Sequence, residues 1–224
     1  MKVRMKGKLI VLEGLDGSGK ATQANLLYEF LREKKISVRK ITFPNYESDS
    51  SALVKMYLAG EFGDSAQDVN AYAASLFYSV DRYAGYRKDW GEFYEAGGIL
   101  VADRYTTSNA VHQCAKLPRS EWASYLQWLF DLEYQKMGIP RPDLVIYLDV
   151  EPQISQRLME ERYHGDEAKK DIHEKDAAYL RQSRRAANYC AQELGWHTVE
   201  CCKGDNMYTR SEIFEKIKSL VEIL

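Results

Sequence analysis

Short apolar runs alternate with helix-like patterns along the whole chain. An apolar run between polar residues or glycines predicts a buried strand, and apolar residues that recur every three or four positions predict a helix. This alternation is typical of an α/β protein that has a parallel sheet of about five strands with helices on both faces. The predicted strands are residues 8–13, 38–43, 99–102, 144–148 and 197–201. The predicted helices are residues 22–34, 51–94 with a break at 60–63, 119–136, a helix that starts at 152, 177–194 and 210–223.

A single domain accounts for the chain of 224 residues. The sequence has no internal repeat, low-complexity segment or linker, so we expect one domain over residues 1–224. A charged segment at residues 162–175 interrupts the pattern and has two interpretations. Mixed charge is usual for a solvated surface, but such a segment also suits a lid that brings a cation over a phosphoryl group and excludes water.

A glycine-rich segment follows the first predicted strand. It reads Gly-Leu-Asp-Gly-Ser-Gly-Lys from Gly14 to Lys20 and leads into a predicted helix. In this setting backbone N–H groups turn toward phosphate oxygens, the helix N-terminus adds positive potential, and the lysine reaches the β- and γ-phosphates. A glycine-rich turn without a ligand is the alternative. We therefore predict an ATP-binding loop of the P-loop kinase type, formed by Gly14, Leu15, Asp16, Gly17, Ser18, Gly19, Lys20, Ala21 and Thr22.

Ala21 departs from the usual phosphate-loop pattern, which has serine or threonine after the lysine. The missing hydroxyl is normally a Mg²⁺ ligand, so the metal has to be held in another way. The strand predicted at residues 99–102 ends at Asp103, which would face the loop because ligands bind at the carboxyl ends of parallel strands. An aspartate that only caps the next helix is the alternative. Arg104 follows directly, and its planar cation suits phosphate, which favours the functional interpretation.

Tyr78 and Arg82 are four residues apart in a predicted helix and therefore share one face. A ring and a guanidinium on one face could hold a nucleotide by its base and its phosphate. The alternative is a core aromatic residue beside a surface ion pair between Asp81 and Arg82, and the pattern alone favours that alternative.

Net charge, hydropathy and cysteine spacing restrict the kinds of partner and the cellular location that we expect. The net charge is −2, from 31 basic and 33 acidic residues, which does not indicate binding to duplex nucleic acid or to membranes. No signal peptide or membrane span is visible. The four cysteines lack Cys-x-x-Cys spacing, so we expect reduced thiols and a cytoplasmic location.

Taken together, the motifs resemble those of the thymidylate kinase family, in order and over nearly the whole chain. The segment Asp103-Arg104-Tyr105 and the charged segment that contains Asp171 and Glu174 are the specific part of the match. The other matching segments are residues 11–23 for the phosphate loop with Glu13 and Asp16, 43–44 for the acceptor-side loop, 78–82 for the thymine-stacking helix, 108–110 after the Asp-Arg-Tyr signature, 142–150 for the fourth strand, and Arg157.

The resemblance implies phosphoryl transfer from ATP to dTMP, which gives ADP and dTDP for dTTP synthesis with Mg²⁺ as cofactor. It implies a homodimer whose partners are these nucleotides, with neither nucleic acid nor a membrane. The implied catalytic residues are Lys20 for the donor phosphates, Asp103 for Mg²⁺, Asp16 for the acceptor sugar or the metal shell, Arg104 for the acceptor phosphate, and Arg162, with Arg157 as a second candidate, for the transferring group.

The resemblance also implies an acceptor site. In it Tyr78 stacks on thymine, Asn109 bonds to the edge of the base, and Arg82 joins Arg104 on the acceptor phosphate. The full set of implied acceptor residues is Phe43, Tyr46, Tyr78, Arg82, Arg104, Ser108, Asn109 and His112.

Three further positions depart from the family pattern. Asn45 stands where many members have an arginine or an acidic residue, and in the lid segment Asp171-Ile172-His173-Glu174 many members have arginine at the second position, which is Ile172 here. His112 replaces a tyrosine that crowds the sugar 2′ position in many members, so the preference for deoxyribose is less secure. A kinase for another pyrimidine nucleotide or a deoxynucleoside, and an inactive nucleotide-binding regulator, remain the alternatives. Two acceptor-side arginines favour a monophosphate acceptor, because a nucleoside acceptor would instead need a base for its 5′-hydroxyl.

Overall fold

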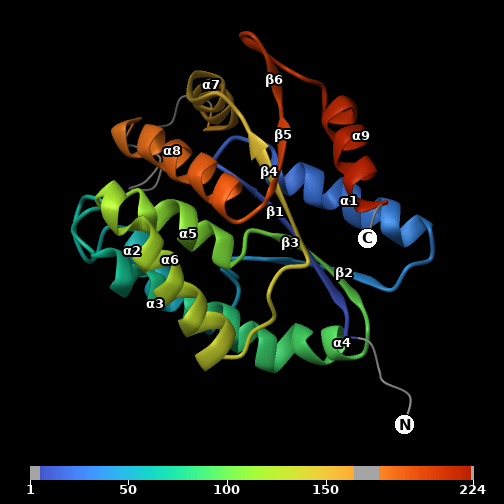
Figure 1. The fold of residues 1–224 in the computed structure, drawn as a ribbon, viewed down its shortest axis with the longest axis horizontal. Coiled ribbons are helices and arrows are strands. Elements are labelled where there is room, and N and C mark those ends of the chain that lie inside the picture. The colour runs from blue at the N-terminus through green and yellow to red at the C-terminus, as the bar shows by residue number, and fades with distance from the viewer. Residues whose placement is uncertain (1–5, 164–176, 223–224) are drawn as a thin grey trace.

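The protein is built around a five-stranded parallel sheet with the strand order β2-β3-β1-β4-β5 (Figure 1). We describe it from a computed structural model that covers residues 6–163 and 177–222. The sequence-based prediction of a parallel sheet of about five strands is confirmed. The strands are β1 (Lys8–Gly14), β2 (Val38–Thr42), β3 (Ile99–Asp103), β4 (Leu144–Asp149) and β5 (His197–Glu200).

Strand β1 lies at the centre of the sheet, between β3 and β4. Leu12 pairs with Asp103 of β3, and Gly14 pairs with Leu148 of β4. The carboxyl ends of the three strands therefore meet at one edge. The helix after β1, α1 (Lys20–Glu33), and the helix after β3, α5 (Thr106–Cys114), lie on opposite faces of the sheet. In open parallel sheets a crevice forms at such a switch point, and ligands bind there.

Helices cover both faces of the sheet because the strands are apolar on both faces. Ile10 and Leu12 point to the face covered by α1 (Lys20–Glu33) and α9 (Arg210–Val221), whereas Leu9 and Val11 point to the other face. There α4 (Gly91–Glu95), α5 (Thr106–Cys114) and α8 (Ala177–Glu193) contribute to the core (Figure 1). The remaining α-helices are α2 (Ala52–Leu58), α3 (Ala71–Gly85), α6 (Trp122–Phe130) and α7 (Pro152–Tyr163).

Several elements differ from the sequence-based prediction. Helix α5 was not predicted, because nearly all its residues are buried and its polar side chains leave no apolar stripe for a periodicity argument. Two π-helical turns, Tyr86–Trp90 after α3 and Asp131–Lys136 after α6, lie within stretches predicted as continuous helix. A small hairpin of β6 (Cys202–Lys203) and β7 (Asn206–Met207) precedes α9. None of the helices in the described part of the chain is both long and apolar enough to cross a membrane.

Candidate active site

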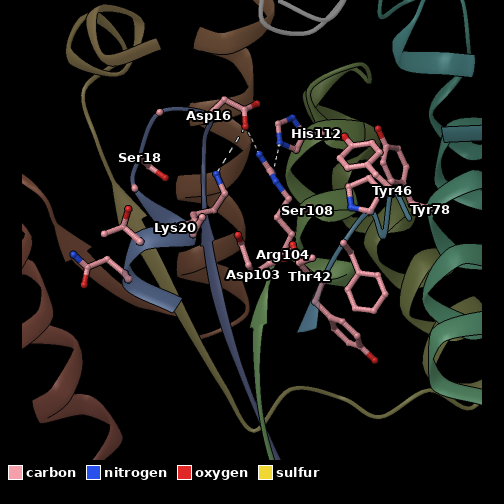
Figure 2. A pocket seen from close by; sticks show the side chains of 18 of the residues that line it. Asp16, Ser18, Lys20, Thr42, Tyr46, Tyr78, Asp103, Arg104, Ser108 and His112 are labelled. Atoms are coloured by element: carbon pink, nitrogen blue, oxygen red, sulfur yellow. Dashed lines mark hydrogen bonds and ion pairs between the residues drawn. The ribbon is translucent and has the colours of Figure 1, made fainter. Parts of the chain in front are cut away.

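A cavity of about 1180 Å³ opens at the carboxyl ends of β1, β2 and β3. The loop between β1 and α1 forms one wall, and α3, α5 and the segment after β2 form the opposite wall. Figure 2 shows Ser18 and Lys20 on one side of Arg104, with Tyr46 and Tyr78 on the other. The cavity therefore has two compartments that meet at Arg104.

The backbone of the glycine loop creates a cradle for an anion. Gly17 and Gly19 adopt left-handed conformations, with φ of 78° and 84°. A Cβ atom at Gly17 would also lie 2.6 Å from the carbonyl oxygen of Ser155 on α7, so no other residue fits there without a shift of the loop. Helix α1 begins at Lys20 without a side-chain cap, which leaves its first N–H groups available to a phosphate.

The Lys20 side chain lies inside this cradle and contacts the backbone of the loop. Only 7% of the residue is exposed, and its Nζ atom donates a hydrogen bond of 2.8 Å to the carbonyl oxygen of Leu15. The Asp16 carboxylate lies 3.9 Å from Nζ. Burial, together with the positive charge of Arg104, lowers the pKa of Lys20 to about 8, although Asp16 and other carboxylates oppose this shift. Lys20 therefore remains mostly protonated at neutral pH and can transfer its hydrogen bond from Leu15 to a phosphate.

Arg104 is held by a dense set of contacts. Its backbone is left-handed, with φ of 67°, and its Nη2 atom is bonded to Asp16. Its Nη1 atom lies 3.3 Å from both Ser108 Oγ and His112 Nε2, and 3.9 Å from Glu13 Oε1. Burial lowers the pKa of Arg104, but the carboxylates of Asp16 and Glu13 outweigh that effect and hold the pKa above its ordinary value. Arg104 is thus a fixed cation between the two compartments.

Glu13 is a buried carboxylate that connects the glycine loop to the start of α5. It is fully buried at the end of β1 and accepts hydrogen bonds from Thr107 Oγ1 at 2.6 Å and Ser108 Oγ at 2.8 Å. The backbone N–H of Gly14 donates to its other oxygen at 3.0 Å. Glu13 therefore joins the phosphate loop to the start of α5, and through Ser108 to Arg104.

Asp103 is positioned to contribute to a Mg²⁺ site. It ends β3 and lines the cavity beside Lys20 and Arg104 (Figure 2). Within residues 6–163 and 177–222 its carboxylate has no hydrogen-bond or ion-pair partner, and no group of three or more metal-ligating side chains is found. Mg²⁺ commonly uses one or two carboxylates together with substrate phosphates and water, so a single free carboxylate at a phosphate cradle fits this ion. Ala21 lines the same wall and offers no ligand.

Helices α3 and α5 form the wall of the cavity opposite the glycine loop. Arg82 is only 1% exposed and pairs with Glu133, whose oxygens lie 2.7 Å from Nε and 2.5 Å from Nη2. The alternative of a surface ion pair between Asp81 and Arg82 is therefore wrong. Asp81 is also buried, and it accepts hydrogen bonds from the backbone N–H of Asn45 at 2.8 Å and from Ser50 Oγ at 2.6 Å. These contacts fasten the segment after β2 to α3.

The structure brings most of the sequence-predicted site residues together. Gly14, Leu15 and Arg157 are exceptions that do not line the cavity, and Arg157 donates a hydrogen bond of 3.5 Å to the carbonyl oxygen of Asp205. The side chain of Arg162 and residues 164–175 of the predicted lid lie outside the described residues. The predicted residues that line the cavity are Asp16, Gly17, Ser18, Gly19, Lys20, Ala21, Thr22, Phe43, Tyr46, Tyr78, Arg82, Asp103, Arg104, Ser108, Asn109 and His112.

The sequence-based prediction missed several residues that line or support the site, and Gln113 and Glu133 are two of them. Gln113 is buried and lines the cavity, and its Oε1 atom has no partner in the described part of the chain. It follows Asn109 by one helical turn, so the helical spacing could have identified it had α5 been predicted. Glu133 lies far from Arg82 in sequence, and no local pattern identifies it.

Comparisons with known proteins agree with this geometry. The family model for thymidylate kinase matches residues 12–204. Thymidylate kinase of Mycobacterium tuberculosis is 30% identical over 191 residues, which cover 84% of this chain and 87% of the relative. The Plasmodium falciparum thymidylate kinase is 31% identical over 174 residues, 76% of each chain. The structure of thymidylate kinase from Candida albicans has the same fold, with a TM-score of 0.69, 20% identity, and coverage of 97% of this chain and 92% of that chain. The present chain therefore belongs to the thymidylate kinase family of phosphotransferases.

Proposed function

We propose that this protein transfers the γ-phosphoryl group of ATP to dTMP and releases ADP and dTDP, with Mg²⁺ as cofactor. The observation that carries the proposal is the position of Arg104. It lies between a phosphate cradle that holds Lys20 and a second compartment lined by Tyr78 and Arg82. Two compartments joined by a fixed cation suit a reaction in which one phosphate passes between two nucleotides.

The donor side uses the loop and the start of α1. The N–H groups of residues 17–22 would surround the β- and γ-phosphates, and Lys20 would leave the Leu15 carbonyl to bind them. Beyond the loop, Met207, Tyr208 and Ile213 line the same cavity and offer an apolar surface for the donor base. Bound Mg²⁺ would neutralise phosphate charge, and Asp103 would hold it, directly or through water.

The acceptor side uses α3 and α5. Tyr78 would stack on the pyrimidine ring, while Asn109 and Gln113 would meet its edge. Arg82 and Arg104 would donate to the acceptor nucleotide, with Arg104 nearest to the donor phosphates. Phe43, Tyr46, Ser108 and His112 complete the wall around the acceptor. We also propose that Asp16 orients the acceptor sugar or the metal shell, and that Arg162 approaches the transferring group.

We further propose that the protein is a homodimer. Tyr72, Leu76, Val80 and Tyr83 form an exposed stripe on α3, with a spacing that places them on one helix face. Leu53 on α2 is also exposed. Large apolar side chains in a row on a surface helix suit an interface between two copies of the chain.

The location and the other partners follow from charge and thiol chemistry. All four cysteines are free, which suits a reducing compartment, and we propose that the protein acts in the cytoplasm. The net charge of −2 provides no excess of basic residues for nucleic acid or an anionic membrane, and we propose nucleotides as the ligands and neither of those as a partner.

An ADP-release assay with ATP, Mg²⁺ and a set of acceptors tests the proposal. The acceptors are dTMP, dUMP, UMP, dCMP and thymidine, and we expect the highest kcat/KM with dTMP. A preference for UMP would move the assignment to another pyrimidine kinase, and His112 is the first residue to examine in that case. Turnover of thymidine alone would indicate a nucleoside kinase. A lack of turnover above the ATP-only blank would leave a nucleotide-binding regulator.

A further inference from the structure

Glu133 is a buried carboxylate at the back of the acceptor compartment. It lies in the π-helical turn Asp131–Lys136 that follows α6, and it is 0% exposed. Single π-helical turns are rare and occur frequently at functional sites. A buried carboxylate is costly unless all its oxygens are engaged, so its partners indicate what it is for.

The partners of Glu133 come from two other elements of the site. Its Oε1 atom accepts from Ser79 Oγ at 2.7 Å and from Arg82 Nη2 at 2.5 Å. Its Oε2 atom accepts from Arg82 Nε and from Thr106 Oγ1, both at 2.7 Å. Ser79 and Arg82 belong to α3, and Thr106 begins α5. The carboxylate is therefore held on both oxygens and cannot rotate away from Arg82.

This arrangement divides the Arg82 guanidinium into two edges. The edge formed by Nε and Nη2 is bound to Glu133. Nη1 has no partner among the described residues, although Arg82 lines the cavity. A guanidinium is planar, so a carboxylate fixed on one edge also fixes the plane and direction of the opposite edge.

We infer that Glu133 is a positioning residue for acceptor binding: it holds the Arg82 guanidinium so that Nη1 is presented to the acceptor nucleotide. The inference rests on the proposed function, since it takes the compartment lined by Arg82 as the acceptor site. The ion pair with Glu133 supplies a donor whose direction is set before the ligand arrives. A donor fixed in advance binds more tightly than one that must be ordered on binding.

Calorimetric titration of dTMP, and separately of ATP, into wild-type protein and Glu133→Gln tests the inference. The variant keeps the side-chain shape but places an amide where the carboxylate bound Arg82. We expect the dTMP Kd to rise about ten- to a hundredfold and the ATP Kd to change less than about twofold, because a small misplacement of a binding group has effects of this size. Arg82→Met and the double variant Arg82→Met/Glu133→Gln complete a cycle. Glu133→Gln should add little in the Arg82→Met background, because the positioned group is already gone.

Tyr125→Phe is the matched control for a merely structural role. Tyr125 lies on α6, and its hydroxyl bonds to Ser75 Oγ of α3 at 2.7 Å and to the backbone carbonyl of Asn109 on α5 at 3.3 Å. The variant therefore loses buried contacts between the same helices without touching Arg82 or Glu133, and its side chain does not line the cavity. Equal losses of dTMP affinity in Tyr125→Phe and Glu133→Gln, an unchanged dTMP Kd in Glu133→Gln, or additive effects in the cycle would overturn the inference. If Glu133→Gln does not fold, Glu133→Asp replaces it, and it should also weaken dTMP more than ATP. Failure of the proposed function looks different, because wild-type protein would then either not bind dTMP or bind it without forming dTDP in the ADP-release assay.

Discussion

Arg104 and Asp16 form an ion pair that joins the two walls of the cavity. Asp16 belongs to the phosphate loop and also lies 3.9 Å from Lys20, whereas Arg104 begins the connection to α5. The pair places a cation at the point where the donor and acceptor phosphates would meet. Because both groups are partly buried, their interaction is screened by solvent less than that of a surface pair.

Replacement of Arg104 by lysine should reduce catalysis although the charge is kept. Lysine lacks the planar fork that bonds to Asp16 while also approaching Ser108 and His112. We expect kcat/KM for dTMP to fall on the order of a hundredfold, with ATP affinity changed less than about threefold. Steady-state kinetics and ATP titration measure the two effects. Arg119→Lys, a change at an arginine that stacks on Trp122 and Tyr189 away from the cavity, is the control. Equal loss of ATP and dTMP affinity in Arg104→Lys would contradict the role given to Arg104.

Introduction of a hydroxyl at Ala21 should strengthen the metal site. Ala21 is exposed at the start of α1, so a threonine side chain can be accommodated there. A hydroxyl at this position of a phosphate loop is a Mg²⁺ ligand, and we expect the Mg²⁺ concentration for half-maximal rate to fall several-fold in Ala21→Thr. Ala21→Val has nearly the same shape without the hydroxyl and should behave like wild type. Identical Mg²⁺ dependence in the threonine and valine variants would show that the metal does not approach this position.

The sequence predicted the sheet and the position of the glycine loop between β1 and α1 well, because both are encoded by contiguous residues. The run that ends at Gly14 and the glycines before Lys20 carry their own local signals. The acceptor wall could not be predicted in the same way. Glu133 is 51 residues from Arg82 and 27 residues from Thr106, and only the packing of α6 against α3 and α5 brings them together. For Asp81, adjacency in the sequence predicted an ion pair with Arg82, and this was wrong. Its carboxylate instead accepts hydrogen bonds from the segment after β2.

A charge on the exposed face of α3 should disrupt the proposed dimer. Val80 lies in the apolar stripe and is 47% exposed, so glutamate there leaves the monomer fold intact but would bury an unpaired charge at the interface. Sedimentation velocity at micromolar concentration should show a dimer for wild type and a monomer for Val80→Glu. Ile36→Glu, at an exposed apolar residue before β2, should remain dimeric. A monomeric wild-type protein, or a dimeric Val80→Glu, would argue against an interface on α3.

Lys116 should make stability depend on pH. Its Nζ atom donates to Tyr57 Oη at 2.7 Å and to the carbonyl oxygen of Val69 at 3.0 Å, and burial lowers its pKa to about 7 from 10.5. Below pH 7 the lysine is charged in both the folded and the unfolded state, and the cost of burying the charge is fully present. Between pH 7 and 10.5 only the unfolded state keeps the proton, so the free energy of unfolding rises with pH in this window.

Urea unfolding of wild type and Lys116→Met at several pH values isolates this effect, because other titrating groups cancel in the difference. The difference in unfolding free energy should change in favour of wild type by roughly 3–5 kcal/mol across the window. A difference that stays constant from pH 6.5 to 9.5 would mean that the lysine is solvated in the folded protein.

Transfer of label from ATP to dTMP tests the central claim most directly. The protein is incubated with Mg²⁺, unlabelled dTMP and ATP labelled at the γ-phosphorus, and the nucleotides are separated by chromatography. We predict that the label appears in dTDP, with one ADP formed for each dTDP. Label that appears only in inorganic phosphate, or that passes to thymidine but not to dTMP, would contradict the account.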